Sequence, residues 1–214
     1  MLVVIDIGNT NITIGIYHGD KLIGNYRLTT KMKRTSDEYG FMVMNFLNAS
    51  KVQPADIKDV IVSSVVPKIM HSFLNGIRKY MHKEPILVGP GIKTGISVKA
   101  ENPKAVGADR IVDAAGAYYE YGGPCLVVDY GTATTFDYVD ANGNFEYGVI
   151  TLGIETGAQA MWTQAPSFRK LKSKNPQAFW RRQQQQACRP DWFTAISDKV
   201  NTLSRNSKRH WALT

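Results

Sequence analysis

Cysteine is scarce in this chain, and its two cysteines lack the spacing of a metal site or a disulfide framework. Cys125 lies in an apolar run and Cys188 lies in a polar segment. A structural zinc site or a disulfide scaffold needs several cysteines at regular intervals, so the sequence excludes both. Cys125 is predicted to be a small core residue.

Long apolar runs are also missing, and the first residues do not have the pattern of a signal peptide. Met1–Ile5 leads directly into Asp6 without a basic region or a small-residue cleavage site. No apolar run approaches the roughly 20 residues that a membrane-spanning helix needs. The sequence therefore predicts a cytoplasmic protein without a membrane partner.

Positive charge is concentrated at one end of the chain. The formal net charge is +8, but residues 166–214 contain 11 of the 26 Lys and Arg and only 2 of the 18 Asp and Glu. Residues 1–165 are therefore close to neutral. A nucleic-acid-binding function would depend on the basic segment alone, and salt-dependent DNA binding lost on deleting 166–214 would be its signature. We expect no nucleic-acid partner.

The hydrophobic pattern of residues 1–165 predicts an α/β protein. β-branched apolar runs separated by short turns indicate two three-stranded meanders, one at 2–7, 11–17 and 21–29 and one at 125–129, 134–139 and 145–150. Apolar residues at helical spacing predict helices at 36–48, 69–81, 105–121 and 154–165. Further strands are expected at 60–66 and 86–88, a loop at 89–103, an N-cap at Ser36, and inward positions for Ala158, Met161 and Trp162.

An Asp-x-Gly pattern occurs twice, each time at the first turn of a meander. The copies are Asp6-Ile7-Gly8-Asn9-Thr10 and Asp129-Tyr130-Gly131-Thr132-Ala133-Thr134. A glycine turn with exposed N–H groups can wrap phosphate oxygens, while a carboxylate at the strand end holds a neutralising cation. For one copy alone, an ordinary hairpin turn with a buried Asp is an equal alternative. The repetition favours two similar units that share one phosphate site.

Asp109 and Arg110 stand side by side near the start of the third predicted helix. Asp109 could accept a proton from a substrate hydroxyl, and Arg110 could bind a substrate carboxylate or phosphate in a bidentate fork. From spacing alone, a helix-start Asp beside a solvated Arg is the simpler interpretation.

Five motifs together resemble the type III pantothenate kinase family in order and spacing over residues 1 to about 165. They are Asp6–Asn11, Ser63–Pro67, Gly89–Gly95, Gly107–Ile111 and Asp129–Thr135. The resemblance implies an actin/hexokinase/Hsp70-like fold of duplicated RNase H-like domains, with the second domain incomplete here. The expected division is 1–117 for the N-terminal domain and 118–165 for the partial C-terminal domain. It also implies a homodimer that transfers the ATP γ-phosphoryl group to pantothenate, the first step of coenzyme A biosynthesis.

The resemblance also implies roles for individual residues. Asp109 would be the general base, with Gly107, Ala108 and Arg110 completing the pantothenate contact. Asp6 would lie near Mg²⁺, and Asp129 would hold a monovalent cation, K⁺ or NH₄⁺. The expected ATP-binding residues are Asp6, Ile7, Gly8, Asn9, Thr10, Asn11, Ile12, Thr13 and Thr132. Positioning and charge neutralisation would then supply most of the catalysis.

Residues 166–214 lose the hydrophobic periodicity and are predicted to be read out of frame. In a shifted reading frame, each new codon consists of the last base of one codon and the first two bases of the next. The codons of Asp191 and Trp192 then give a codon that can only encode Leu, and those of Trp192 and Phe193 give one that can only encode Val. Across Gln186–Val200 the shifted frame permits GMQAGLVYGYIGQG, which resembles the family's continuation. The hypothesis is a frameshift near Ala165 or Pro166 that impairs the kinase activity of the chain as printed.

Two other functions fit the same motifs. One is a non-catalytic regulator resembling the Bvg accessory factor, which a shortened chain would favour and the presence of Asp109 and Asp129 opposes. The other is a kinase of the same superfold that phosphorylates a different small acceptor, which a screen of acceptors would distinguish.

Overall fold

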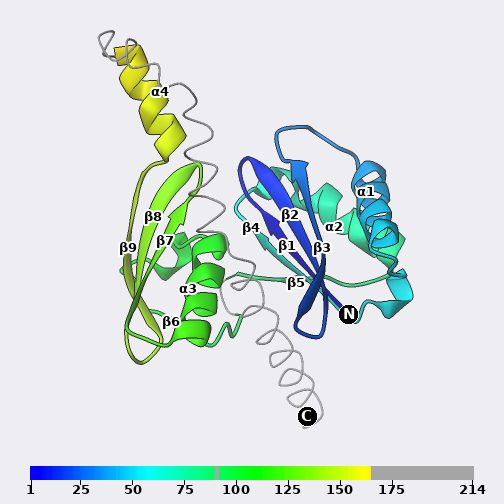
Figure 1. The fold of residues 1–214 in the computed structure, drawn as a ribbon, viewed down its shortest axis with the longest axis horizontal. Helices are drawn as coiled ribbons and strands as arrows, with labels where there is room; N and C mark the ends of the chain where they lie inside the picture. The colour runs from blue at the N-terminus through cyan, green and yellow to red at the C-terminus, as the bar shows by residue number, and fades with distance from the viewer. Residues whose placement is uncertain (90–91, 165–214) are drawn as a thin grey trace.

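The computed structural model describes residues 1–89 and 92–164, and these form two β-sheets with helices between and beside them (Figure 1). The first sheet has the order β3-β2-β1-β4-β5. Its strands are β1 (Leu2–Ile7), β2 (Asn11–His18), β3 (Lys21–Thr29), β4 (Asp59–Ser64) and β5 (Ile86–Leu87). β1, β2 and β3 are antiparallel neighbours, whereas β4 pairs parallel to β1 and β5 parallel to β4. The predicted first meander is confirmed.

The second sheet has the order β6-β9-β8-β7. Its strands are β6 (Ser97–Val98), β7 (Cys125–Tyr130), β8 (Ala133–Val139) and β9 (Asn144–Leu152). β7, β8 and β9 are antiparallel neighbours, so the second predicted meander is also confirmed. β6 pairs parallel to β9 within the segment that was expected to be a loop. The predicted α/β class with two meander-based sheets holds.

Helices α1 (Ser36–Ala49) and α2 (Pro67–Met81) cover one face of the first sheet. The N-cap of α1 is Thr35, one residue before the predicted cap Ser36, which is instead the first residue of the helix. The Thr35 hydroxyl accepts from the Glu38 N–H at 3.3 Å, and the Glu38 carboxylate accepts from the Thr35 N–H at 2.7 Å. Such a reciprocal capping box satisfies two backbone donors that a helix start otherwise leaves unpaired.

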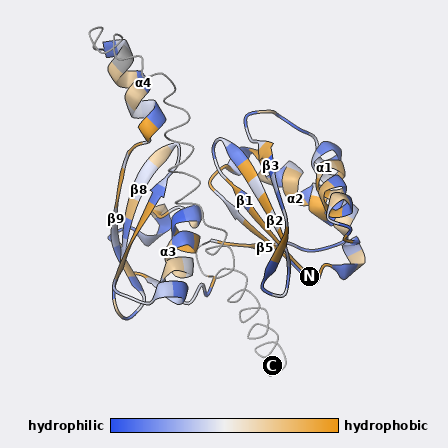
Figure 2. Cartoon of the chain, in the orientation of Figure 1, coloured by the Kyte–Doolittle hydropathy of each residue, from blue (hydrophilic) through white to orange (hydrophobic). Residues whose placement is uncertain are grey.

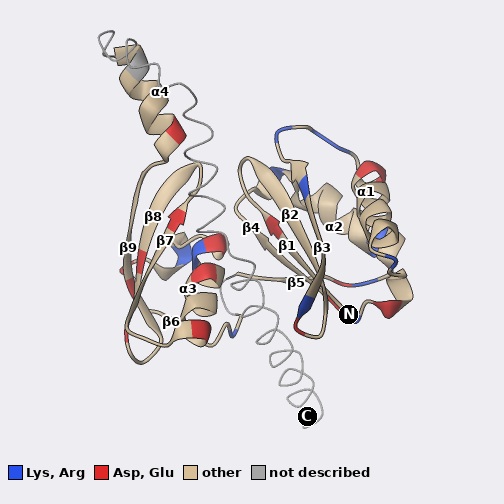
Figure 3. Ribbon diagram, in the orientation of Figure 1, with Lys and Arg blue, Asp and Glu red and all other residues tan. Residues whose placement is uncertain are grey.

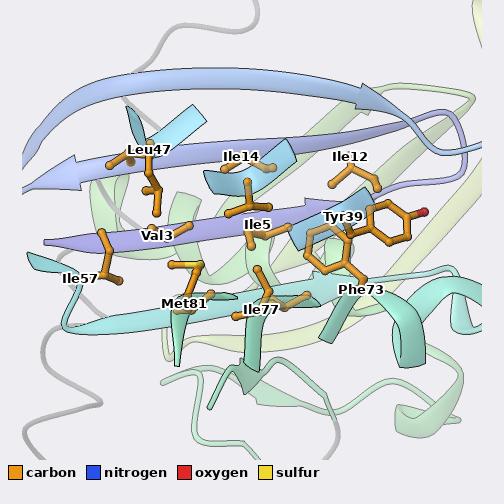
Figure 4. Close-up of a cluster of buried hydrophobic side chains, with 14 of the residues drawn as sticks. Val3, Ile5, Ile12, Ile14, Tyr39, Leu47, Ile57, Phe73, Ile77 and Met81 are labelled. Carbon is orange, nitrogen blue, oxygen red and sulfur yellow. The ribbon is translucent and has the colours of Figure 1, made fainter. Parts of the chain in front are cut away.

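The main core lies between these helices and the first sheet, and Figure 4 shows it in close-up. Side chains that alternate along β1 and β2 point toward both helices, and hydrophobic colouring is concentrated on the central strands in Figure 2. The fully buried members include Val3, Ile5, Ile12, Ile14, Tyr39, Leu47, Phe73 and Ile77. Each large side chain of this kind stabilises the fold by roughly 1.5–3 kcal/mol. This core fixes the ends of β1 and β2.

Helix α3 (Ala108–Tyr121) packs against both sheets. Val112 contacts the second apolar cluster of the first sheet, which contains Leu2 and Tyr17. Two residues later, Ala114 is buried with Val139 and Phe145 of the second sheet. The expected domain boundary between residues 117 and 118 falls inside this continuous helix, so the division into domains stays a proposal.

The second sheet leaves many apolar side chains exposed. Leu126 on β7 is 61% exposed, and Tyr147, Val149 and Leu152 on β9 are 60–63% exposed. Among the described residues, β7 pairs only with β8, so its other edge is open. Exposed apolar patches and open edges of this kind mark surfaces that another segment or another chain covers.

Helix α4 (Ile154–Gln164) follows β9 and extends away from the second sheet (Figure 1). Met161 was expected to point inward but is 52% exposed, because the described residues offer it no packing surface at this distance from the sheet. Residues 166–214, predicted to be out of frame, lie outside the described residues. No helix in the described ranges has both the length and the apolarity to cross a bilayer.

Candidate functional site

The two Asp-x-Gly turns have closely similar local structures. Asp6 is the last residue but one of β1, opposite Thr13, and Asp129 is the last residue but one of β7, opposite Thr135. Two residues after each Asp, a glycine closes the turn through its N–H: Gly8 donates to a carbonyl three residues ahead at 3.0 Å, and Gly131 donates to one two residues ahead at 2.9 Å. The internal repeat seen in the sequence is therefore also a structural repeat.

The two turns meet in space. The hydroxyl oxygens of Thr10 and Thr132 lie 2.9 Å apart in a hydrogen bond, although 122 residues separate them in the chain. Both threonines are exposed, so this bond lies on an open surface. The backbone of the second turn is backed by Gly153, where a Cβ would overlap the carbonyl oxygens of Gly131 and Thr132.

The expected ATP-binding segment divides into buried and accessible residues. Ile7 and Ile12 are completely buried in the main core, so only their backbone groups are available to a ligand. Asn9, Thr10 and Asn11 are exposed at the tip of the turn. The accessible part is therefore a short polar loop held in place by two buried isoleucines.

Carboxylates from three separate elements converge beside these turns. Burial is the main cause that raises the pKa of Asp6 to about 6, followed by repulsion from Asp109, with a smaller contribution from Asp129. The nearby Ser63 hydroxyl opposes the increase; it is buried and close to the carboxylate but lacks the geometry of a full hydrogen bond. Burial, then Asp109 and Asp137, raise the pKa of Asp129. Figure 3 shows acidic positions on β1, α3 and the second sheet.

Asp109 lies in the first turn of α3, where Gly107 is the N-cap. Its Oδ1 accepts a hydrogen bond from the Arg110 N–H at 2.8 Å, and a Cβ at position 107 would overlap the same oxygen. The start of a helix carries a partial positive charge that favours a carboxylate. Because glycine has no Cβ, position 107 leaves the space in which the Asp109 carboxylate lies.

Arg110 is held by a buried ion pair that the sequence did not predict. Its Nε donates to both carboxylate oxygens of Asp137, at 2.9 and 3.2 Å, and its Nη2 also contacts Asp137 Oδ1. The Asp137 side chain is 2% exposed and that of Arg110 is 12% exposed. The Arg110 guanidinium was expected to bind a substrate anion, but Asp137 occupies its Nε–Nη2 edge. Only the Nη1 side of the guanidinium is left to bind such an anion.

Comparison with known proteins identifies the family of this chain. The sequence profile of the type III pantothenate kinases matches residues 2–205. The chain belongs to this family. A type III pantothenate kinase from Bifidobacterium longum subsp. infantis is 52% identical over 178 residues, which cover 83% of this chain and 70% of the relative. One from Agathobacter rectalis is 51% identical over 176 residues, covering 82% and 68%.

Solved structures resemble the fold more distantly. The activator of 2-hydroxyisocaproyl-CoA dehydratase from Clostridium difficile, solved with bound ADPNP, has a TM-score of 0.45 and 14% identity. The superposition covers 96% of this chain and 66% of that protein.

Membership in the type III pantothenate kinase family implies that the enzyme uses ATP and a divalent cation. No group of three or more metal-ligating side chains in residues 1–89 and 92–164 is arranged to enclose a metal by itself. In kinases Mg²⁺ is usually held by one or two carboxylates together with waters and substrate phosphates. The oxygen donors of Asp6 and the repulsion among its neighbouring carboxylates suit a hard cation of this kind.

Asp113 is a further carboxylate near Asp6, Asp109 and Asp129 that sequence reasoning missed. It is on α3, one turn after Asp109, and its pKa is raised well above the usual value. Burial is the main cause, followed by repulsion from Asp129, Asp6 and Asp109. The signal was present in the sequence, because residues four apart lie on the same face of a helix.

Replacing Asp113 with asparagine should stabilise the kinase in the absence of nucleotide and divalent cation. The folded protein penalises the charged form of Asp113, so at pH 7–8 its neutral isostere should raise the free energy of unfolding by on the order of 1 kcal/mol. As pH falls through the raised pKa, wild-type Asp113 takes up a proton and the advantage of the variant should shrink. Urea denaturation at pH 8 and pH 5 measures both effects.

Asp37→Asn is the matched control for this prediction. Hydrogen bonds from Lys79 and Tyr80 lower the pKa of Asp37, so its charged form is favoured in the folded state. The control should gain no stability at pH 8. If Asp113→Asn also gained none, the carboxylate at position 113 would not be a source of repulsion.

Proposed function

We propose that this chain transfers the γ-phosphoryl group of ATP to the primary hydroxyl of pantothenate, which gives 4′-phosphopantothenate and ADP and begins coenzyme A biosynthesis in the cytoplasm. The observation that supports it best is the meeting of the two Asp-x-Gly turns at Thr10 and Thr132, beside Asp109. Two turns rich in N–H and hydroxyl donors suit the phosphates of one nucleotide. The family match supplies the acceptor.

In this proposal Asp109 is the general base. The pantothenate hydroxyl oxygen attacks the γ-phosphorus, the bond from that phosphorus to the ADP oxygen breaks, and the hydroxyl proton passes to the Asp109 carboxylate. Gly107 leaves room for that carboxylate, and Ala108 and Arg110 complete the acceptor site. Because the transition state of phosphoryl transfer is loose, positioning and charge neutralisation account for most of the rate.

Two cations belong to the proposal. Asp6 would contact Mg²⁺, which neutralises phosphate charge, and Asp129 would hold K⁺ or NH₄⁺. Burial first, and then repulsion from neighbouring carboxylates, raises the pKa of both groups, and cations would offset that repulsion. The proposed active form is a homodimer, in keeping with the exposed apolar side chains of β7 and β9.

The test measures ADP and 4′-phosphopantothenate by mass spectrometry after incubation with ATP, Mg²⁺ and pantothenate, with K⁺ or with Na⁺. It uses the printed chain and the frame-restored chain, which we define as residues 1–165 continued by the peptide that the gene encodes in the shifted frame. Pantothenate-dependent formation of ADP by the frame-restored chain, stimulated by K⁺, is the expected result. ADP formation with another small acceptor but not with pantothenate would instead indicate a different kinase, and its absence with every acceptor would indicate a regulator.

A further inference from the structure

The stability of the fold alone does not explain the buried Arg110–Asp137 ion pair. Asp137 lies in the middle of β8 and is 1% exposed, in a strand whose other buried residues are Thr134 and Val139. Withdrawing an ion pair from water costs about as much as the pair recovers, and a pair of apolar residues would often be as stable. An explanation in terms of what the pair holds in place is therefore needed.

Three groups fix the guanidinium of Arg110. Asp137 binds its Nε–Nη2 edge, and the Phe145 ring lies with its centroid 5.5 Å from the Arg110 Cζ. Opposite Asp137 on β9 is Gly148, where a Cβ would overlap both Arg110 Nη2 and Asp137 Oδ1. Position 148 therefore has to be glycine for the pair to form with this geometry. The second sheet supplies all three groups, whereas Arg110 comes from α3.

Within the described part of the chain, the remaining guanidinium nitrogen, Nη1, has no hydrogen-bond partner. Among the described residues, none accepts a hydrogen bond from Arg110 Nη1, while Nε and Nη2 are both bound. Arg110 follows Asp109 directly, and the Arg110 N–H donates to the Asp109 carboxylate. A guanidinium locked on one edge loses little further side-chain entropy when its other edge binds an anion.

Building on the proposed function, we propose that Asp137 is a positioning residue for substrate selection. It clamps Arg110 so that the Nη1 side faces the acceptor site and binds the carboxylate of pantothenate. Asp137 does not touch the substrate in this arrangement. It acts through Arg110, with Gly148 providing the space, and its effect is on recognition of the acceptor rather than on the transferred phosphoryl group.

The experiment compares binding of pantothenate with binding of pantothenol, in which a hydroxymethyl group replaces the carboxylate. Calorimetry is done on the full printed chain and on the frame-restored chain, each unaltered and as Asp137→Asn, Arg110→Lys, the double variant of these two, and Asp140→Asn. Asp140→Asn removes one carboxylate just after β8 without touching Arg110, because Asp140 bonds to Asn142 and Asn144. Thermal unfolding of every variant is recorded alongside.

The unaltered kinase should prefer pantothenate over pantothenol by roughly 10- to 100-fold, as expected for a charge-assisted hydrogen bond. Asp137→Asn and Arg110→Lys should both lose most of that preference, and the double variant should lose no more than either single one. Affinity for ATP should not change, and Asp140→Asn should keep the preference.

Three results would overturn the inference. In the first, Asp137→Asn keeps the preference and only lowers the melting temperature, which makes the pair purely structural. In the second, affinity for ATP falls while the preference stays, which assigns Arg110 to the phosphates. In the third, Arg110→Lys loses the preference and Asp137→Asn does not. Failure of both unaltered chains to bind pantothenate would instead refute the proposed function, and this inference with it.

Discussion

Replacing Asp109 with asparagine should lower the kcat of the frame-restored chain by roughly 10²- to 10⁴-fold, the range that a general base contributes. Asparagine has the same shape and can still accept the hydrogen bond that the Arg110 N–H donates at 2.8 Å. It cannot take a proton from the pantothenate hydroxyl. KM for ATP and the melting temperature should change little, so steady-state kinetics and thermal unfolding separate a chemical effect from a structural one.

Gly107→Ala tests the same carboxylate without changing its charge. The Gly107 backbone has φ −61° and ψ 147°, which alanine adopts without strain, so the new Cβ acts only by displacing Asp109 Oδ1. We expect a smaller loss of kcat than in Asp109→Asn, with the same KM for ATP. The matched control is Gly157→Ala, since the nearest atom to a Cβ there is Leu152 Cβ at 3.9 Å.

Asp113 provides the sharpest alternative to Asp109. It lies one turn further along α3 and shares the electrostatic surroundings of Asp6 and Asp129. If Asp109→Asn kept nearly full kcat and Asp113→Asn lost it, the general base would be Asp113. Loss in Asp109→Asn with retention in Asp113→Asn supports the assignment made here.

The sequence was sufficient for features whose cause is local. The strands of both meanders follow from β-branched runs broken by turn residues, and α1 and α2 follow from apolar residues at helical spacing. Thr35 was also readable as the cap, because it stands three residues before Glu38 in the capping-box pattern, whereas Ser36 does not. The repeated Asp-x-Gly turns were found because each is a continuous short motif.

Features that depend on contacts between distant segments could not be predicted. β6 is only two residues long and exists because Ser97 and Val98 pair with β9, more than 40 residues later. Nothing near Asp137 indicates that its partner is Arg110, 27 residues earlier, or that Gly148 leaves room for both. A lone Asp in an apolar strand signals a buried partner, but it does not name one.

The exposed surface of the second sheet is relevant to the hypothesis that residues 166–214 are read out of frame. β7 has an open edge within the described chain, and Leu126, Tyr147, Val149 and Leu152 are all about 60% exposed. In the frame-restored chain we expect the continuation and a second copy of the chain to cover this surface. The family profile extends to residue 205, past the proposed boundary, so the boundary stays a prediction.

The frame-restored chain should therefore turn over pantothenate at least roughly 10²-fold faster than the printed chain, because small displacements of a catalytic group already cost that much. It should also remain in solution at concentrations at which the printed chain aggregates through its open edge and exposed apolar side chains. Sequencing the DNA across codon 165 comes first, followed by turnover and sedimentation of both chains. Residues 1–165 alone serve as the control and should behave like the printed chain, since the hypothesis assigns no part of the site to residues 166–214. Equal turnover by the printed and frame-restored chains, or stop codons throughout the shifted frame, would contradict the hypothesis and make residues 166–214 a genuine part of this kinase.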